Sequence, residues 1–348
     1  MTKTVKIKNI EIGGGNKIAV QSMTNTDTLD TESTFEQLKR LQIAGCDIAR
    51  IAVSNEKEVQ AVKGLIGKID MPLVADIQYD YRLAVACCEI GFDKIRFNPG
   101  NIGDDGKVKK VVDAAKVHNV PIRIGVNTGS LEKEFESLEP SDALCKSALK
   151  HVVLLEKFGF YDIVISVKSS DVRTMIGAYR KLSEEVDYPL HVGVTESGSG
   201  LRGTVRSAIG IGSLLMDGIG DTIRVSLSGD PEKEIDAARL ILQEAGIDKN
   251  FCEVVSCPTC SRCKYDLKSV VDELKNAVKD IKTPVKVAVM GCAVNGPGEA
   301  KDADFGVCGG GNGKAALFVG GKVVKTIEYS EIIPELMRLI EQKTAAKI

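Results

Sequence analysis

Residues 47–76, DIARIAVSNEKEVQAVKGLIGKIDMPLVAD, contain the repeating unit that decides the fold. A short run rich in β-branched residues, 47–53, is followed by an amphipathic stretch and then by a second such run, 72–76. Each run is bounded by Gly, Pro, Asn or Asp, and the same alternation continues through the first 250 residues. It predicts six further strands, at 18–23, 93–97, 120–126, 162–167, 188–194 and 221–227.

Eight strands, each followed by a helical stretch such as 34–45 or 140–159, match a TIM (β/α)₈ barrel in number and size. The alternative is a doubly wound open sheet, which usually carries a Gly-rich phosphate loop after its first strand. Here that strand is followed by TNTDTLD, and the sequence contains no GxGxxG or Walker motif. The pattern therefore favours an α/β barrel over residues 1–250.

The alternation of strands and helices ends near residue 250, where a cysteine cluster precedes a different order of elements. We expect a small α+β domain over residues 251–348. Its predicted elements are a helix at 267–280, strands at 284–291, 304–308 and 315–319, a hairpin turn at 320–321, and a helix from about 331.

The composition excludes several classes of protein. The formal net charge of −2 does not favour a nucleic-acid partner. No stretch approaches the apolar length of a membrane span, and the first residues lack the apolar run of a signal peptide. We therefore expect a cytoplasmic protein that binds neither nucleic acid nor membranes.

Basic residues occur in or just after five of the predicted strands, where TIM barrels carry their chemistry. They are Arg50, Arg96, Arg123, Lys168 and Arg224. Two nearby carboxylates, Asp76 and Glu196, can neutralise two of them at most. Because Arg forks suit phosphate oxygens, the surplus positive charge indicates an anionic ligand. A buried salt-bridge network is the alternative.

Four of the ten cysteines stand apart from the rest, which read as small buried hydrophobes. Cys257, Cys260 and Cys263 form a C-x-x-C-x-x-C run, and Cys292 lies in a Gly-rich loop seven residues before Glu299. Thiols in this number favour an iron–sulfur cluster. Zinc and a redox dithiol remain alternatives, and one alternative function is a phosphate-binding barrel enzyme with a purely structural zinc module.

Several long segments resemble one family, the bacterial hydroxymethylbutenyl diphosphate synthases, which are iron–sulfur reductases of the non-mevalonate isoprenoid pathway. The resemblance extends along essentially the whole chain. Its clearest segments are QSMTNTDT (21–28), IRFNPGNIG (95–103), IRIGVNTGSLE (122–132), CPTC (257–260) and VAVMGCAVNGPGEA (287–300).

The resemblance implies a two-electron reductive ring opening and dehydration of 2-C-methyl-D-erythritol 2,4-cyclodiphosphate to hydroxymethylbutenyl diphosphate. It implies a homodimer in which one subunit's cluster domain covers the other's barrel, with ferredoxin or flavodoxin as electron donor. It implies a [4Fe–4S] cluster held by Cys257, Cys260, Cys292 and Glu299. The implied substrate-binding residues are Arg50, Asp76, Arg96, Asn98, Arg123, Asn127 and Lys168, and the implied catalytic residues are Glu196, for proton transfer, and Glu299.

Three positions depart from the pattern of that family. Gln78 stands where His is usual, and Gln cannot carry a proton at neutral pH. Ser261 replaces a Gly after the second cysteine. Cys263 is an additional thiol that could compete with Cys292 for the role of ligand.

Overall fold

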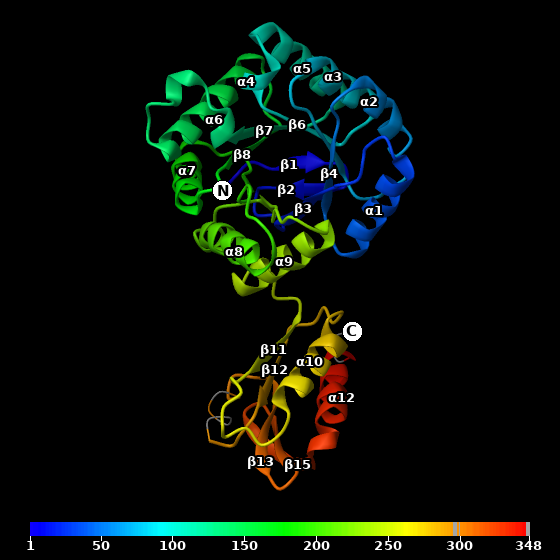
Figure 1. Ribbon diagram of the computed structural model, residues 1–348, viewed down its shortest axis with the longest axis vertical. Helices are drawn as coiled ribbons and strands as arrows, with labels where there is room; N and C mark the ends of the chain where they lie inside the picture. The colour runs from blue at the N-terminus through cyan, green and yellow to red at the C-terminus, as the bar shows by residue number, and fades with distance from the viewer. Residues whose placement is uncertain (295–297, 299, 346–348) are drawn as a thin grey trace. The chain divides into compact units, whose positions relative to one another are not determined.

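The chain is seen here as a computed structural model, which describes residues 1–294, 298 and 300–345 (Figure 1). It divides into two compact units, Met1–Ile247 and Asp248–Ile348. Each unit has a hydrophobic core of its own, and each is described separately below.

Eight parallel strands in the described part of the first unit form its sheet, in the order β8-β7-β6-β5-β4-β3-β10-β9. A bridge between Ile165 and Leu190 joins the two ends, so the sheet is nearly closed and the predicted TIM barrel is confirmed. The strands are β3 (Ala19–Met23), β4 (Ile48–Ala52), β5 (Leu73–Asp76), β6 (Lys94–Phe97), β7 (Ile122–Asn127), β8 (Ile163–Lys168), β9 (His191–Val192) and β10 (Thr222–Ile223).

Helices surround these strands, as Figure 1 shows. They are α1 (Thr31–Ile43), α2 (Glu56–Lys63), α3 (Tyr81–Ile90), α4 (Pro99–Ile102), α5 (Asp105–His118), α6 (Pro140–Lys157), α7 (Val172–Glu185), α8 (Gly200–Met216) and α9 (Pro231–Glu244). Their starts follow the capping chemistry of the sequence, since Asp30 and Asn55 accept hydrogen bonds from the backbone of α1 and α2. Their apolar faces pack against the outer faces of the strands.

A short antiparallel hairpin, which the sequence pattern did not predict, closes one end of the barrel. It consists of β1 (Val5–Ile7) and β2 (Ile10–Ile12). Its Val5, Ile7 and Ile12 form an apolar cluster with residues near the starts of the barrel strands. Those partners are Ala19, Ile48, Val74 and Val164. The hairpin therefore covers the end of the barrel where these strands begin.

The last two barrel strands are shorter than predicted. A Cβ atom on Gly193 would lie 2.4 Å from the carbonyl oxygen of Arg224, so the backbones approach more closely than a side chain would allow. The regular pairing of β9 with β10 ends just before this contact. The predicted strands at 188–194 and 221–227 are consequently loops over most of their length.

The second unit has a mixed five-stranded sheet in the order β11-β12-β13-β14-β15. The strands are β11 (Cys252–Ser256), β12 (Val285–Met290), β13 (Phe305–Gly311), β14 (Lys314–Val319) and β15 (Lys322–Glu328). The first three run parallel and the last two are antiparallel. Helices α10 (Leu267–Val278) and α12 (Ile332–Ala345) pack against the sheet, and the predicted α+β class is confirmed.

Candidate active site

The carboxyl ends of adjacent barrel strands bring the predicted charged residues together. Asp76 on β5 pairs in register with Arg96 on β6, and Arg96 pairs with Arg123 on β7. Arg50 lies on β4, which is the neighbour of β5 on its other side. Because side chains alternate between the two faces of a strand, all four occupy positions that face the barrel interior.

Asp76 neutralises two of these arginines. Its Oδ1 lies 2.9 Å from Nη1 of Arg96, and its Oδ2 lies 3.6 Å from Nε of Arg50. Burial opposes ionisation of the carboxyl group, but Arg50, Arg96 and Arg123 outweigh it and lower the pKa of Asp76 to about 2. The carboxylate is therefore ionised at neutral pH and serves two cations at once.

Arg123 and Lys168 have no carboxylate partner within the described residues. Arg123 is 1% exposed, and its Nη1 donates a long hydrogen bond of 3.5 Å to Oε1 of Gln21. Lys168 is buried at the end of β8, beside Asn127 in the register of the two strands. Burial and the neighbouring arginines lower the pKa values of both side chains. This uncompensated positive charge is what an anionic ligand would neutralise.

Arg224 belongs to a second pair whose acid the sequence reasoning missed. Its Nε lies 3.5 Å from Oε2 of Glu234, a buried residue of α9 that also accepts hydrogen bonds from Ser22 Oγ and Leu227 N. Glu234 belongs to a helix, and a glutamate in an amphipathic helix is usually exposed to solvent. The sequence therefore offered no reason to expect this residue at the site.

Lys94 was also missed, although a signal existed. It is wholly buried at the start of β6, and Nζ has no hydrogen-bond partner in the described structure. In the segment KIRF it lies two residues before Arg96 and therefore on the same face of the strand. Burial, together with Arg123 and Arg50, lowers the pKa of Lys94 well below 10.5.

The other predicted barrel residues are less alike in their positions. Asn98 is buried and caps α4 through a 3.1 Å hydrogen bond from the Gly100 N–H, and Asn127 ends β7. Glu196 is exposed in the loop after β9, with a left-handed φ of 52°, and no ion pair in the described structure links it to the arginines. The structure therefore gathers the basic residues but leaves Glu196 outside their ion pairs.

The cysteine loops follow two neighbouring parallel strands of the second unit. Cys257 comes directly after β11, and Cys292 comes two residues after β12, so both lie at the same edge of the sheet. The N–H of Gly291 donates a 3.2 Å hydrogen bond to Sγ of Cys257, which places the two cysteine loops in contact. Cys260 is exposed, and hydrogen bonds from Arg262 lower the pKa of its thiol.

This donor set suits an iron–sulfur cluster in its chemistry. Backbone N–H groups directed at sulfur are typical of such sites, and the Gly291–Cys257 contact is one. Within the described residues, no three His, Cys, Asp or Glu side chains form a group that could hold a single metal ion. Glu299, the predicted fourth ligand, lies outside the described residues.

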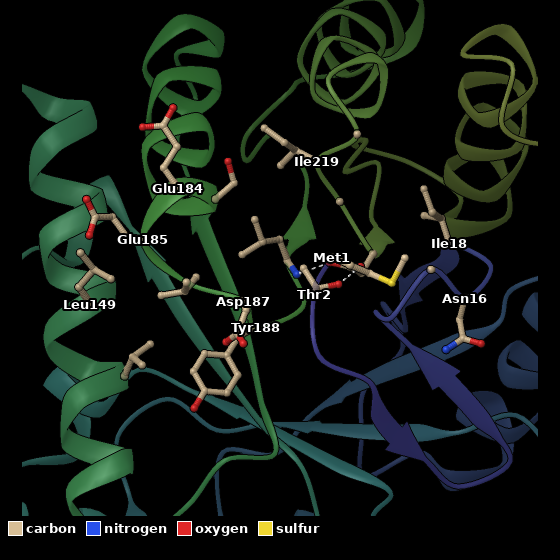
Figure 2. Close-up of a pocket in the computed structure, with 18 of the residues that line it drawn as sticks. Met1, Thr2, Asn16, Ile18, Leu149, Glu184, Glu185, Asp187, Tyr188 and Ile219 are labelled. Atoms are coloured by element: carbon tan, nitrogen blue, oxygen red, sulfur yellow. Dashed lines mark hydrogen bonds between the residues drawn. The ribbon is translucent and has the colours of Figure 1, made fainter.

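A cavity of about 900 Å³ lies near the chain's first residues, at the end of the barrel where the strands begin (Figure 2). This is the end opposite the buried arginines. Its lining includes Thr2, Glu184, Glu185 and Asp187, and Thr2 donates a hydrogen bond to Asp221. An acidic lining does not suit a phosphorylated substrate. The basic end of the barrel therefore suits an anion better than this cavity does.

Two family profiles match nearly the whole chain. The GcpE TIM-barrel domain matches residues 2–239, and the GcpE protein C-terminal domain matches residues 253–342.

The chain belongs to the GcpE family.

Two relatives of high identity carry the name 4-hydroxy-3-methylbut-2-en-1-yl diphosphate synthase (flavodoxin). The protein of that name from Caldanaerobacter subterraneus subsp. tengcongensis is 54% identical over 98% of this chain and 97% of its own length. The one from Clostridium perfringens is 52% identical over 98% of both chains.

Solved structures at lower identity support the barrel alone. A type I 3-dehydroquinate dehydratase from Clostridium difficile has a TM-score of 0.52 at 17% identity, covering 71% of this chain and 99% of its own. A dihydropteroate synthase from Coxiella burnetii has a TM-score of 0.51 at 14% identity, covering 70% and 99%. Among the described residues, no helix combines the length and hydrophobicity that a membrane span needs.

Proposed function

We propose that this chain catalyses the two-electron reductive ring opening and dehydration of 2-C-methyl-D-erythritol 2,4-cyclodiphosphate, which gives 4-hydroxy-3-methylbut-2-en-1-yl diphosphate. The observation that carries the proposal is its membership of the GcpE family, with identities of 52–54% across nearly the full length of relatives named for this synthase. The chain is thus an oxidoreductase of isoprenoid precursor synthesis. The alternative, a barrel enzyme with a structural zinc module, is not favoured.

The barrel unit binds the substrate in this proposal. Arg123 and Lys168, which lack carboxylate partners in the described residues, contact the diphosphate, while Asp76 holds Arg50 and Arg96 in place. Asn98 and Asn127 add hydrogen bonds from the same end of the barrel. Bidentate arginine contacts fix the orientation of the diphosphate, and orientation is needed because only one bond of the ring must break.

The second unit holds a [4Fe–4S] cluster through Cys257, Cys260, Cys292 and Glu299. The three thiols and the Gly291 N–H that donates to Cys257 support this set. When bound, such a cluster supplies electrons one at a time. Glu299 would hold the remaining iron through its carboxylate, which is a weaker iron ligand than a thiolate.

The reaction consumes two electrons and one proton and releases water, and it converts a cyclic diphosphate into a terminal one. Glu196 supplies the proton to the departing hydroxyl group. Its exposed position and left-handed backbone, in a loop at the end of β9, leave the carboxyl free to reach a ligand at the mouth. Flavodoxin, or ferredoxin in its place, delivers the electrons to a homodimer in the cytoplasm.

Anaerobic turnover tests the proposal directly. The reconstituted protein, dithionite and a viologen should convert the cyclodiphosphate to the open-chain diphosphate, and the oxidised protein should be brown. The matched variants are Lys168→Met, expected to raise KM, and Lys109→Met on the exposed face of α5, expected to leave KM unchanged. A colourless protein with stoichiometric zinc and no turnover would support the structural-zinc alternative instead.

A further inference from the structure

Glu234 is a buried acid near the carboxyl ends of the barrel strands that the proposed function does not use. It is 4% exposed and belongs to the first turn of α9. An ionised carboxylate is seldom buried without partners, because taking it out of water is costly. The groups that surround Glu234 therefore indicate what this side chain contributes to the molecule.

Three groups from β3 and from the segment after β10 converge on this carboxylate. Oγ of Ser22, in β3, donates a 3.0 Å hydrogen bond to Oε2, and the N–H of Leu227 donates a 2.9 Å hydrogen bond to Oε1. The guanidinium of Arg224 lies against both oxygens, with Nε 3.5 Å from Oε2 and Nη2 3.5 Å from Oε1. Glu234 thus joins the end of β3 to the segment that follows β10, its neighbour in the sheet.

The segment after β10, residues 224–228, leaves the regular pairing of the barrel early. β10 is only two residues long, and its pairing with β9 stops just before the close backbone approach at Gly193. Beyond that point the N–H of Ser228 donates a 3.0 Å hydrogen bond to the Gly198 carbonyl, and the N–H of Leu227 donates to Glu234. A side chain of a helix therefore holds backbone that strand pairing holds elsewhere in the barrel.

Glu234 also acts on the charges of the barrel mouth. Arg50, a proposed substrate ligand, is buried, and burial lowers the pKa of its guanidinium to about 9 against the opposing charges of Asp76 and Glu234. Arg224 disfavours the charged form of Arg50, as a like charge does. By pairing with Arg224, Glu234 reduces this repulsion and adds an attraction of its own. The carboxylate therefore favours a charged Arg50, which is the form that binds an anion.

We propose that Glu234 is a positioning residue of the substrate site, which holds Ser22, Arg224 and residues 224–228 in the arrangement that receives the diphosphate. This inference rests on the proposed function, because it names a residue that orders the same site. Glu234 acts through its partners and takes no part in proton or electron transfer. Its loss should therefore weaken substrate binding more than it slows the chemical step.

The first test uses the reconstituted full-length holoenzyme in anaerobic turnover with dithionite and a viologen. Glu234→Ala removes both acceptor oxygens and should raise KM for the cyclodiphosphate about tenfold, while kcat falls less than about threefold. Glu234→Gln keeps an oxygen for the N–H of Leu227 but removes the charge, so its KM should rise about threefold. Asp236→Asn, an exposed change on the same helix, is the matched control and should leave both constants unchanged.

Two further readouts do not depend on turnover. Amide hydrogen exchange in residues 224–229 should become roughly tenfold faster in Glu234→Ala, because the N–H of Leu227 loses its acceptor. Helix α5 should exchange at the same rate in both proteins. Inorganic diphosphate, titrated by calorimetry, should bind about tenfold more weakly to Glu234→Ala than to the unchanged protein, and Asp236→Asn should bind it normally.

Failure of this inference can be told apart from failure of the proposed function. If Glu234→Ala does not fold, Glu234→Gln decides, and an unchanged KM with unchanged affinity for inorganic diphosphate in that variant would overturn the positioning role. A fall in kcat at constant KM would also overturn it, because partial loss of folded enzyme has that pattern. Binding of inorganic diphosphate that depends on Glu234, without any reduction of the cyclodiphosphate by the unchanged protein, would overturn the proposed function and leave the role of Glu234 in place.

Discussion

Asp76 holds the arginines at the carboxyl ends of the barrel strands in place. It is buried and ionised, and it pairs with Arg50 and Arg96, which are themselves buried. Removing one partner of a buried ion pair leaves an uncompensated charge, and the resulting cost exceeds the value of the pair itself. Without the carboxylate between them, the positive charges of Arg50 and Arg96 repel each other.

Asp76→Asn should therefore lower the free energy of unfolding by about 3–5 kcal/mol at pH 7. The folded pKa of Asp76, about 2, is below its ordinary value of 3.8, so its stabilising effect is full above that value and lost as the pH falls toward 2. Urea unfolding at several pH values measures this. The difference between the two proteins should shrink below about pH 4, and Asp113→Asn on the exposed face of α5 should stay within about 0.5 kcal/mol. A constant difference down to pH 2 would contradict the assignment.

For Lys94 we expect the opposite effect, because removing its amino group should stabilise the protein. Its pKa is lowered on folding, so the unfolded chain binds more protons and the stability of the protein rises with pH up to about 10.5. Lys94→Met keeps the length of the side chain and removes the titrating group. It should stabilise the protein at pH 7, and the gain should diminish by about 1.4 kcal/mol per pH unit as the pH approaches 10.

Thermal and urea unfolding of Lys94→Met at pH 7 and pH 9.5 provide the measurement. The exposed Lys109→Met is the control, and its effect should not vary over this range. A variant that destabilises the barrel equally at both pH values would mean that Lys94 is charged and paired in the folded state.

At the scale of elements, the sequence patterns located most of the fold because each barrel strand carries its own local signal. Short β-branched runs between Gly, Pro and Asp predicted the strands from β3 to β8 to within two residues at each end. The hairpin of β1 and β2 was missed, because strands of three residues hold too little pattern. β9 and β10 were predicted too long, because the close approach at Gly193 is a tertiary contact.

The candidate site shows the same division. Arg50, Arg96 and Arg123 could be found because a charge inside an apolar strand is anomalous in itself. Glu234 could not, because a glutamate on a helix is ordinary until the fold turns it toward Ser22 and Arg224. Proximity of residues far apart in the chain is decided by packing, and a single sequence does not record it.

Gly193 offers a test of how element ends shape the mouth. A Cβ atom there would lie 2.4 Å from the Arg224 carbonyl oxygen and 2.9 Å from Nζ of Lys168. Since backbone cannot yield as a flexible side chain can, Gly193→Ala should separate β9 from β10 and displace Lys168. We expect at least a tenfold rise in KM for the cyclodiphosphate, equivalent to about 1.4 kcal/mol.

Gly212→Ala in α8 is the matched control, because nothing lies within 4 Å of its added methyl group. It should leave KM unchanged and stabilise the helix by roughly 0.5–1 kcal/mol. Equal KM values for Gly193→Ala and the unchanged enzyme would show that the end of β9 does not shape the substrate site.

At the scale of the whole molecule, the proposed function assigns substrate binding to one unit and reduction to the other, and each unit has a core of its own. The barrel unit packs its helices around its own strands, and the second unit buries Leu274, Leu336 and Ile340 against its own sheet. The basic residues of the proposed substrate site are all in the first unit, and the clustered cysteines are all in the second. Substrate binding should therefore be separable from reduction.

A chain ending at Ile247 tests that separation. Its core is complete without the remaining residues, so it should fold into a barrel with a cooperative thermal transition. Because Arg123 and Lys168 are retained, it should bind the cyclodiphosphate within about tenfold of the full-length affinity, a loss of up to 1.4 kcal/mol, as measured by isothermal titration calorimetry. It should catalyse no reduction with dithionite and a viologen, because it has none of the proposed iron ligands. A folded fragment that binds no cyclodiphosphate, while the full-length protein does, would mean that the second unit completes the anion site and that binding and reduction cannot be assigned to separate units.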